Sequence, residues 1–272
     1  MAKEIKEEKH ISVARACRII SLERTMYYYR SVKDDTEVEE KLRWYAEQFP
    51  TRGFPEYFKR MRKEGLPWNH KRVNRVYKKL GMSKRKRYKR RIPNREKKAL
   101  LQPIHPNLTW SMDFMHDVLE SGRKFRTLNI IDDYNREALA VEADYSFTSE
   151  RVVQTLGQLI EFRGKPKEIR SDNGPEFIAK AFEGFCENSG ITHLSIQKGK
   201  PMQNGFIERF NRTYREDVLD ATIFENLNQV REVTELWMRD YNENHPHSSL
   251  ANMSPKEFLK SKAEKKLSTL AL

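Results

Sequence analysis

The sequence predicts an α/β protein in which a mixed five-strand sheet with flanking helices follows a small helical region that resembles a helix-turn-helix. Three observations support this prediction. In residues 1–100, hydrophobic residues recur at the spacing of α-helices. A run in which apolar and polar residues alternate, as in a strand, begins at Leu108. Between the later predicted strands, the hydrophobic residues return to helical spacing. With 272 residues, 38% of them hydrophobic, the chain is long enough for two modest domains with packed cores.

The N-terminal region is predicted to contain two helical parts. Within residues 1–33, a break near Ser21 separates two short helices, which is compatible with a helix-turn-helix although the turn contains no glycine. Residues 34–83 are expected to form a three-helix domain, whose third helix begins after the N-cap Asn69 and ends at Gly81.

One face of that third helix is cationic. Its inward stripe is formed by valines, Tyr77 and Leu80, and its outer face carries five cations with no intervening acid: Lys71, Arg72, Arg75, Lys78 and Lys79. A solvated charged helix has the same pattern, but this concentration of positive charge favours a helix that lies in a DNA groove. We therefore expect residues 34–83 to bind DNA.

The positive charge is concentrated in the first hundred residues, which contain 30 Lys and Arg against 13 Asp and Glu; the remaining 172 contain 22 against 26. Residues 84–102 are too poor in apolar side chains to form a core and are predicted to be a basic linker. A solubility tail or a localisation signal would have the same composition, but a cationic linker can follow a phosphate backbone. Its expected DNA contacts include Lys84, Arg85, Lys86 and Arg87.

Residues 103–262 are predicted to form the sheet domain, followed by a C-terminal tail at residues 263–272. Strands are expected at 108–119, 124–131, 137–145, 168–170 and 191–196, and helices at 149–162, about 175–189, about 206–218 and about 228–242. The first three strands follow one another as an antiparallel meander and helices separate the later ones. The sheet should therefore be mixed, with helices on its faces.

The stretch from Lys198 to Leu219 places one carboxylate on a predicted helix. An apolar stripe recurs every four residues at Phe206, Phe210, Tyr214 and Val218. Glu208 lies off this stripe, and Arg212 and Arg215 follow it at helical spacing. A solvated Glu and Arg pair is the simpler interpretation of this stretch alone, but the same face suits a metal ion beside phosphate.

Three carboxylates stand where an α/β sheet can bring them together: Asp113 on the first strand, Asp172 after the fourth, and Glu208 on the helix after the fifth. An Asp before Asn-Gly is often only a turn residue. Three acids without a matching thiolate or imidazole suit Mg²⁺ or Mn²⁺ rather than zinc. Two such ions can activate a water or a 3′-hydroxyl for in-line attack on a phosphodiester, so the expected chemistry is DNA cutting and joining.

Other residues exclude several classes of protein. Cys17 and Cys186 have no partners at metal-ligand spacing and indicate neither a zinc site nor a disulfide framework. His116 and His193, near the strands, are expected to be structural. No apolar run approaches the roughly 18 residues of a membrane helix, and the first residues do not resemble a signal peptide, so we expect a cytoplasmic protein.

Several motifs of this chain resemble those of bacterial insertion-sequence transposases of the OrfB type, in the group founded by the element numbered three, with a retroviral-integrase-like core. The similar segments cover about residues 37–260 and include Trp110–Asp113, Ile131–Arg136, Ser171–Phe177, Asn204–Phe210, and His247–Leu250 followed by Ser254 and Pro255. Thirty-five residues separate Asp172 from Glu208, and a basic residue, Arg215, follows that Glu by seven positions, as in the D,D(35)E family.

The resemblance implies an RNase-H-like fold and transposition by cleavage of transposon ends and strand transfer, with Mg²⁺ as cofactor and Mn²⁺ as a substitute. It implies that Asp113, Asp172 and Glu208 are catalytic, metal-binding acids, and that Lys198, Asn204, Arg212 and Arg215 contact DNA near the site. The implied partners are terminal inverted repeats, target DNA, further copies of the chain on DNA, and an upstream OrfA or an OrfA–OrfB fusion. The implied location is the bacterial nucleoid.

The sequence departs from the family pattern at His245, where Arg is usual, and at Ser21, where Gly is usual. Two alternatives use the same residues. One is a DNA-binding regulator whose second half is catalytically silent, and the other is a nuclease that does not join strands. The presence of all three acids and of Arg215 argues against a regulator with a catalytically silent second half.

Overall fold

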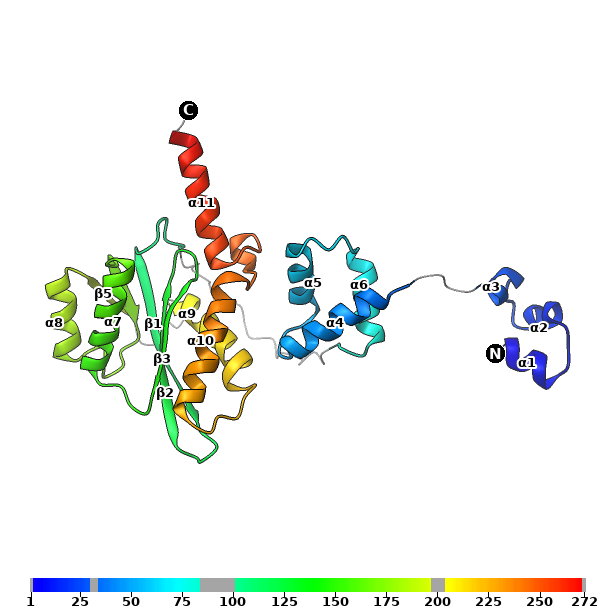
Figure 1. Ribbon diagram of the computed structural model, residues 1–272, viewed down its shortest axis with the longest axis horizontal. Helices are drawn as coiled ribbons and strands as arrows, with labels where there is room; N and C mark the ends of the chain where they lie inside the picture. Colours follow the sequence, from blue (N-terminus) through cyan, green and yellow to red (C-terminus); the bar gives the residue numbers. More distant parts are fainter. Residues whose placement is uncertain (1, 30–33, 84–100, 197–203, 271–272) are drawn as a thin grey trace. The chain divides into compact units, whose positions relative to one another are not determined.

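The computed structural model describes residues 2–29, 34–83, 101–196 and 204–270, with side chains up to residue 264 (Figure 1). Its contacts divide the chain into two compact units, residues 1–43 and 44–272. The predicted linker at 84–102 lies almost entirely outside the described residues, as do Lys84, Arg85, Lys86, Arg87 and Lys198.

The first unit contains α1 (Ala2–Glu8), α2 (Val13–Ile19), α3 (Arg24–Tyr28) and the start of α4 (Thr36–Gln48). Ser12 caps α2 by accepting a hydrogen bond from the Arg15 amide, at 3.3 Å. The predicted break is present, since Ser21 adopts the left-handed conformation with φ of 52° between α2 and α3. The sequence did not predict α1, because its charged residues give no clear apolar period.

The second unit begins with the remainder of α4, followed by α5 (Phe54–Lys63) and α6 (His70–Lys79). Buried tyrosines join the three helices: the Tyr45 ring stacks on Tyr57 with centroids 5.5 Å apart, and Tyr57 meets Tyr77 edge to face. The Asn69 side chain accepts a hydrogen bond from the Lys71 amide, which confirms the predicted cap of α6.

The sheet contains β1 (Thr109–Val118), β2 (Lys124–Asp132), β3 (Ala138–Asp144), β4 (Glu168–Ser171) and β5 (Thr192–Ser195), in the order β3-β2-β1-β4-β5. The pairs β1–β2 and β2–β3 are antiparallel, whereas β1–β4 and β4–β5 are parallel. The predicted mixed five-strand sheet of RNase-H-like type is therefore confirmed.

Helices cover both faces of the sheet (Figure 1). On one face lie α7 (Ser149–Arg163) and α8 (Lys180–Ser189); on the other lie α9 (Gly205–Tyr214), the π-helical turn η2 (Arg215–Leu219) and α10 (Leu227–Glu243). The chain continues through the short 3-10 helix η3 (Ser248–Leu250) to α11 (Pro255–Leu270), which extends into the segment predicted to be a tail. No helix within the described residues is long and apolar enough to cross a membrane.

One predicted boundary was wrong. The helix expected from Pro175 begins at Lys180, because the Gly174 carbonyl accepts hydrogen bonds from the amides of Phe177 and Ile178 and closes a turn there. By contrast, the apolar stripe predicted around Glu208 is confirmed: Phe210, Tyr214 and Val218 are buried in the core, and Phe206 packs against it.

Candidate active site

The alternation of β1 directs Asp113 toward α9. Trp110 and Met112 are fully buried on the α7 and α8 side of the sheet, so Asp113 points to the opposite face. There its Oδ2 accepts a hydrogen bond from Nδ2 of Asn211 on α9, at 2.8 Å. Its Oδ1 accepts a second hydrogen bond from the Phe114 amide, at 2.9 Å.

Burial raises the pKa of Asp113 to about 6, and the negative charges of Asp172 and Glu208 contribute to this rise. The hydrogen bonds from Phe114 and Asn211 oppose the rise, because they stabilise the carboxylate. The three acids, which are distant in the sequence, are therefore electrostatic neighbours in the fold.

The register of the parallel pair β1–β4 explains how Asp172 approaches Asp113. Ser111 lies opposite Arg170, and each acid follows two positions later on its own strand or just beyond it. The Asp172 side chain also accepts a hydrogen bond from the Gly174 amide, at 3.0 Å, so it closes a local turn. The turn interpretation and the site interpretation of Asp172 are thus compatible.

Glu208 lies in the first turn of α9, and its side chain is exposed. Asn211 stands one helical turn later on the same side of α9 and links the helix to two strands. Its Oδ1 accepts a hydrogen bond from Nδ2 of Asn129 on β2, at 2.7 Å, while its own amide donates to Asp113. Since Asn129 is fully buried, this chain of side chains fixes α9 against the sheet.

Asn129 and Asn211 were missed by the sequence analysis. A signal for Asn211 was present, because a residue three positions after Glu208 must share its side of a helix. A signal for Asn129 was weaker: a buried amide in a strand of apolar residues requires a partner, but the strand pattern does not say which one.

The donor chemistry of the three acids fits a hard divalent cation. All the candidate ligands are carboxylate oxygens, and the mutual repulsion recorded at Asp113 is what a bound cation would relieve. Among the side chains that the structure describes, however, no three His, Cys, Asp or Glu residues form a group that could hold a metal ion. The assignment of the acids as metal ligands stays a prediction.

Arg215 connects the end of α9 to β1. Its guanidinium donates to the His116 carbonyl at 2.8 Å and forms ion pairs with Asp117 at 3.4 Å and Asp220 at 3.6 Å. Arg212 is more exposed and pairs with Glu216 at 3.6 Å. No ion pair within the described residues joins Glu208 to either arginine, so the simple interpretation of a solvated Glu and Arg pair does not hold here.

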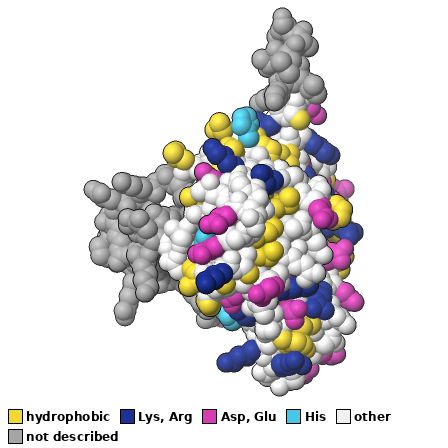
Figure 2. Space-filling view, turned by 90° about the vertical axis from the view of Figure 1, so that its left-hand side faces the viewer, with side chains coloured by type: hydrophobic (Ala, Val, Ile, Leu, Met, Phe, Trp, Pro, Cys, Tyr) yellow, Lys and Arg dark blue, Asp and Glu magenta, His cyan; other side chains and the backbone are white. Residues whose placement is uncertain are grey.

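The other predicted DNA contacts have different degrees of exposure. On α6, Lys71, Arg75, Lys78 and Lys79 are exposed and Arg72 is half-buried, as expected for an outer face. Asn204 is buried at the start of α9, and its Oδ1 has no hydrogen-bond partner among the described residues. On the face of the sheet domain that carries α8, the described Lys and Arg side chains are interspersed with Asp and Glu (Figure 2), so the described residues of that face form no concentrated positive patch.

The expectation that His193 is structural is supported. Its Nε2 lies 2.8 Å from Ser171 Oγ, and its ring meets Phe182 edge to face. Burial lowers its pKa, which favours the neutral form of this packed imidazole.

Comparisons with known proteins show what this chain is similar to. The integrase core domain family matches residues 103–201, and a second family also described as integrase core domain matches residues 189–255. The uncharacterized 31.7 kDa protein of insertion element IS407 from Burkholderia multivorans is 37% identical, over 93% of this chain and 92% of that protein. The 39.2 kDa protein of insertion element IS476 from Xanthomonas euvesicatoria is 35% identical, over 93% of this chain and 73% of that protein.

A more distant relative has a named activity. Transposase InsD of insertion element IS2 from Escherichia coli is 26% identical, over 85% of this chain and 80% of that protein. Likeness to solved structures is limited: the HTLV-2 integrase catalytic core domain matches 57% of this chain and 97% of that chain, with 21% identity and a TM-score of 0.47. Family membership therefore rests on the sequence relatives and the two integrase core families.

Proposed function

Because this chain belongs to the insertion-element transposases, DDE-type polynucleotidyl transferases with an integrase core, we propose that it cleaves the ends of its element and joins them to target DNA. The observation that supports this most strongly is the convergence of charge at Asp113. The charges of Asp172 and Glu208 both act on that carboxyl, while Asn211 holds the helix that carries Glu208.

In this proposal, Asp113, Asp172 and Glu208 hold Mg²⁺, for which Mn²⁺ can substitute. The bound ions would supply charge stabilisation and activation of a 3′-hydroxyl or water for in-line attack on a phosphodiester. The protein's own contribution is positioning: Asp113 lies within β1, Asp172 directly follows the adjacent strand β4, and the Asn129–Asn211 pair fixes the helix that carries Glu208. Asp113 must lose its proton to act as a ligand.

We further propose that the cationic face of α6 and the residues around α9, including Arg215, bind the DNA backbone. The DNA partners would be terminal inverted repeats and target DNA. Because two ends must be held together, the active species would be a homo-oligomer assembled on DNA. An upstream OrfA, or an OrfA–OrfB fusion, would be the protein partner of a chain of OrfB type.

A strand-transfer assay with purified variants tests the function. Asp172→Asn and Glu208→Gln should abolish Mg²⁺-dependent cleavage and joining and retain DNA binding. Glu235→Gln is a matched control, because Glu235 is also an exposed helical acid and pairs only with Arg239 among the described residues. Full activity of Asp172→Asn would refute the proposal. Cleaved but unjoined products from the native chain would indicate a nuclease, and binding without any nicking would indicate a regulator.

A further inference from the structure

A cavity of about 560 Å³ lies beside α9, apart from the three acids. Its walls come from α5, from the turn between β2 and β3, from α9, and from the segment after α10. The α9 residues that line it, among them Phe206 and Arg209, lie on a different side of the helix from Glu208 and Asn211, because successive helical residues are rotated by about 100°. The helix therefore contributes one side to the candidate active site and another to this cavity.

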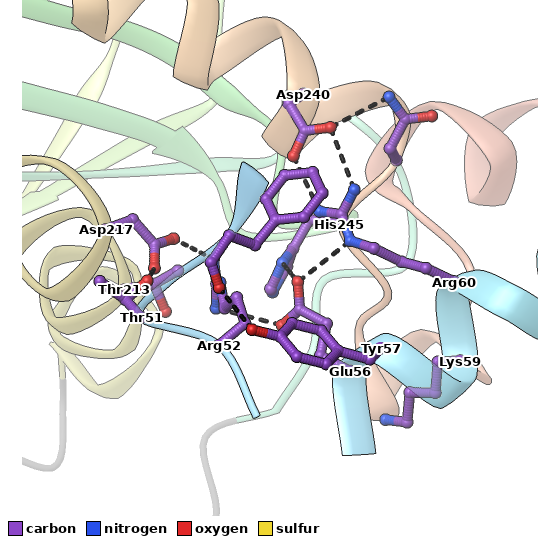
Figure 3. Close-up of polar contacts among 12 residues, drawn as sticks. Thr51, Arg52, Glu56, Tyr57, Lys59, Arg60, Thr213, Asp217, Asp240 and His245 are labelled. Atoms are coloured by element: carbon purple, nitrogen blue, oxygen red, sulfur yellow. Dashed lines mark hydrogen bonds and ion pairs between the residues drawn. The ribbon is translucent and has the colours of Figure 1, made fainter. Parts of the chain in front are cut away.

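The charged side chains that line the cavity are mostly cationic. Arg52, Lys59, Arg136 and Arg209 line it, and Glu56 is the one acid among the described residues of the lining. Glu56 is already compensated, since Arg52 lies 3.3 Å and Arg60 3.2 Å from its carboxylate oxygens, and His245 Nδ1 lies 3.3 Å away (Figure 3). Arg52 in turn is paired with Asp217. Three cations of the lining, Lys59, Arg136 and Arg209, thus remain without a compensating acid in the cavity.

Arg136 is the most unusual of the three. It is only 8% exposed, it adopts the left-handed conformation with φ of 63°, and its guanidinium lies over the Phe206 ring, 3.5 Å from the centroid. Its Nη1 has no hydrogen-bond partner among the described residues. The nearby acid Asp133 is bound instead by Arg170, at 2.6 Å. A buried guanidinium with an unused donor, held in a strained turn, is costly unless an acceptor binds it.

Further donors surround the same space. Lys59 Nζ donates to Ser248 Oγ at 2.9 Å, which holds the ammonium at the cavity wall. The buried His247 Nε2 also has no partner among the described residues, and burial lowers the pKa of this imidazole to about 2, so it stays neutral. Arg209 is exposed and forms no ion pair within the described residues. The first residue of α9, Gly205, adds the positive end of a helix dipole.

We propose that this cavity binds a non-reacting phosphate of the DNA backbone, through Arg136 and Arg209 with support from Lys59. This inference rests on the proposed function, because it takes DNA to be the substrate. A phosphodiester fits the donors: it carries one negative charge and two free oxygens, which a guanidinium can contact through two parallel hydrogen bonds. The contact would anchor the strand on one side of α9 while the acids act on the other.

The first test measures the salt dependence of binding to a duplex that covers the element's end. Arg209→Gln should weaken binding about tenfold and reduce the slope of log K against log salt by about one, the change expected for one lost phosphate contact. Arg136→Gln should do the same. Arg239→Gln is the matched control, because it removes one exposed arginine on α10 whose one ion pair among the described residues is with Glu235 and which does not line the cavity.

The second test replaces single backbone phosphates of that duplex with uncharged methylphosphonates. One position, or two adjacent ones, should weaken binding of the native chain but not of Arg209→Gln, because the contact is already absent there. If every position affects both proteins equally, the cavity does not bind a phosphate and the inference fails. This outcome would contradict the phosphate site alone. The proposed function would be contradicted by a different result, namely that the native chain does not join strands. Because Arg136 is buried, the Arg136→Gln variant could fail to fold. Arg209 is exposed, so the Arg209→Gln variant still provides the test in that case.

Discussion

The Asn211 amide donates a hydrogen bond to the Asp113 carboxylate, 2.8 Å away, across the contact between α9 and β1. The same side chain accepts a hydrogen bond from Asn129, so both the oxygen and the nitrogen of its amide are engaged. The candidate acid on the central strand and the helix that carries Glu208 are therefore joined by one side chain. We regard Asn211 as a positioning residue, because it acts through Asp113.

Asn211→Leu should reduce strand transfer by about 10- to 100-fold, because both the orientation of α9 and the hydrogen bond to Asp113 are lost. The hydrogen bond from Asn211 lowers the pKa of Asp113, so its removal should shift the acidic limb of the pH–activity profile upward. A purely structural role would lower activity at every pH without moving the profile. An unchanged profile would contradict the positioning role.

Asp113→Asn should stabilise the metal-free protein at neutral pH. The pKa of Asp113 is raised to about 6 in the fold, above its unfolded value, so the folded state holds this proton more tightly and ionisation costs stability as pH rises through that window. The expected gain is about 1–3 kcal/mol at pH 7.5 in the presence of a chelator. It should vanish near pH 4, where the carboxyl is protonated. Urea denaturation at the two pH values measures it, and destabilisation at pH 7.5 would contradict the prediction.

Glu56→Gln should have the opposite pH dependence. Burial alone would raise the pKa of Glu56, but the hydrogen bond to His245 and the charges of Arg52 and Arg60 outweigh it and lower the pKa to about 2. The carboxylate therefore stabilises the fold above its unfolded pKa, and this stability is lost as pH falls toward 2. The variant should be less stable than the native chain by about 1–3 kcal/mol at pH 7, with the difference shrinking below about pH 5. A difference that stays constant with pH would contradict this account.

Asp217→Ala should destabilise the chain by about 2–4 kcal/mol in chemical denaturation. Asp217 lies in η2 and binds the Arg52 guanidinium and the Thr51 hydroxyl, the latter at 2.7 Å (Figure 3). It also accepts a hydrogen bond from the Trp237 indole at 3.0 Å. Its loss removes an acceptor shared by three half-buried donors, although Arg52 keeps its contact with Glu56. The exposed pair Arg239–Glu235 supplies the control, and Glu235→Ala should cost about 0.5 kcal/mol or less.

The same Asp217 variant also tests how the helical part of the second unit affects the active site. Since η2 continues directly from α9, loss of the contact with Arg52 should loosen the helix that carries Glu208. Hydrogen exchange of the α9 amides should accelerate in Asp217→Ala and remain unchanged in Glu235→Ala. Equal protection in both variants would show that α9 is held by the sheet alone.

Periodic patterns let the sequence predict the elements of this fold. The alternation that begins at Leu108 predicted the strand that carries Asp113, and the four-residue stripe placed Glu208 off the core side of its helix. These features depend only on the backbone period of a strand or a helix, which neighbouring residues encode. The start of α8 was missed, because the turn after Gly174 interrupts a pattern that apolar residues alone would continue.

The sequence by itself thus determined the strands of the sheet, the helices that cover it, and the positions of the three candidate acids along them. Only the tertiary structure decided what holds those acids and what surrounds them. The Asn129–Asn211 contact spans 82 positions, and Arg52 meets Asp217 across 165. Arg136 gains its unusual surroundings from α9 and from a segment after α10. Hydrophobic burial fixes such elements against one another without regard to sequence distance. A polar side chain then finds its partner, or is left without one, according to where packing has placed it.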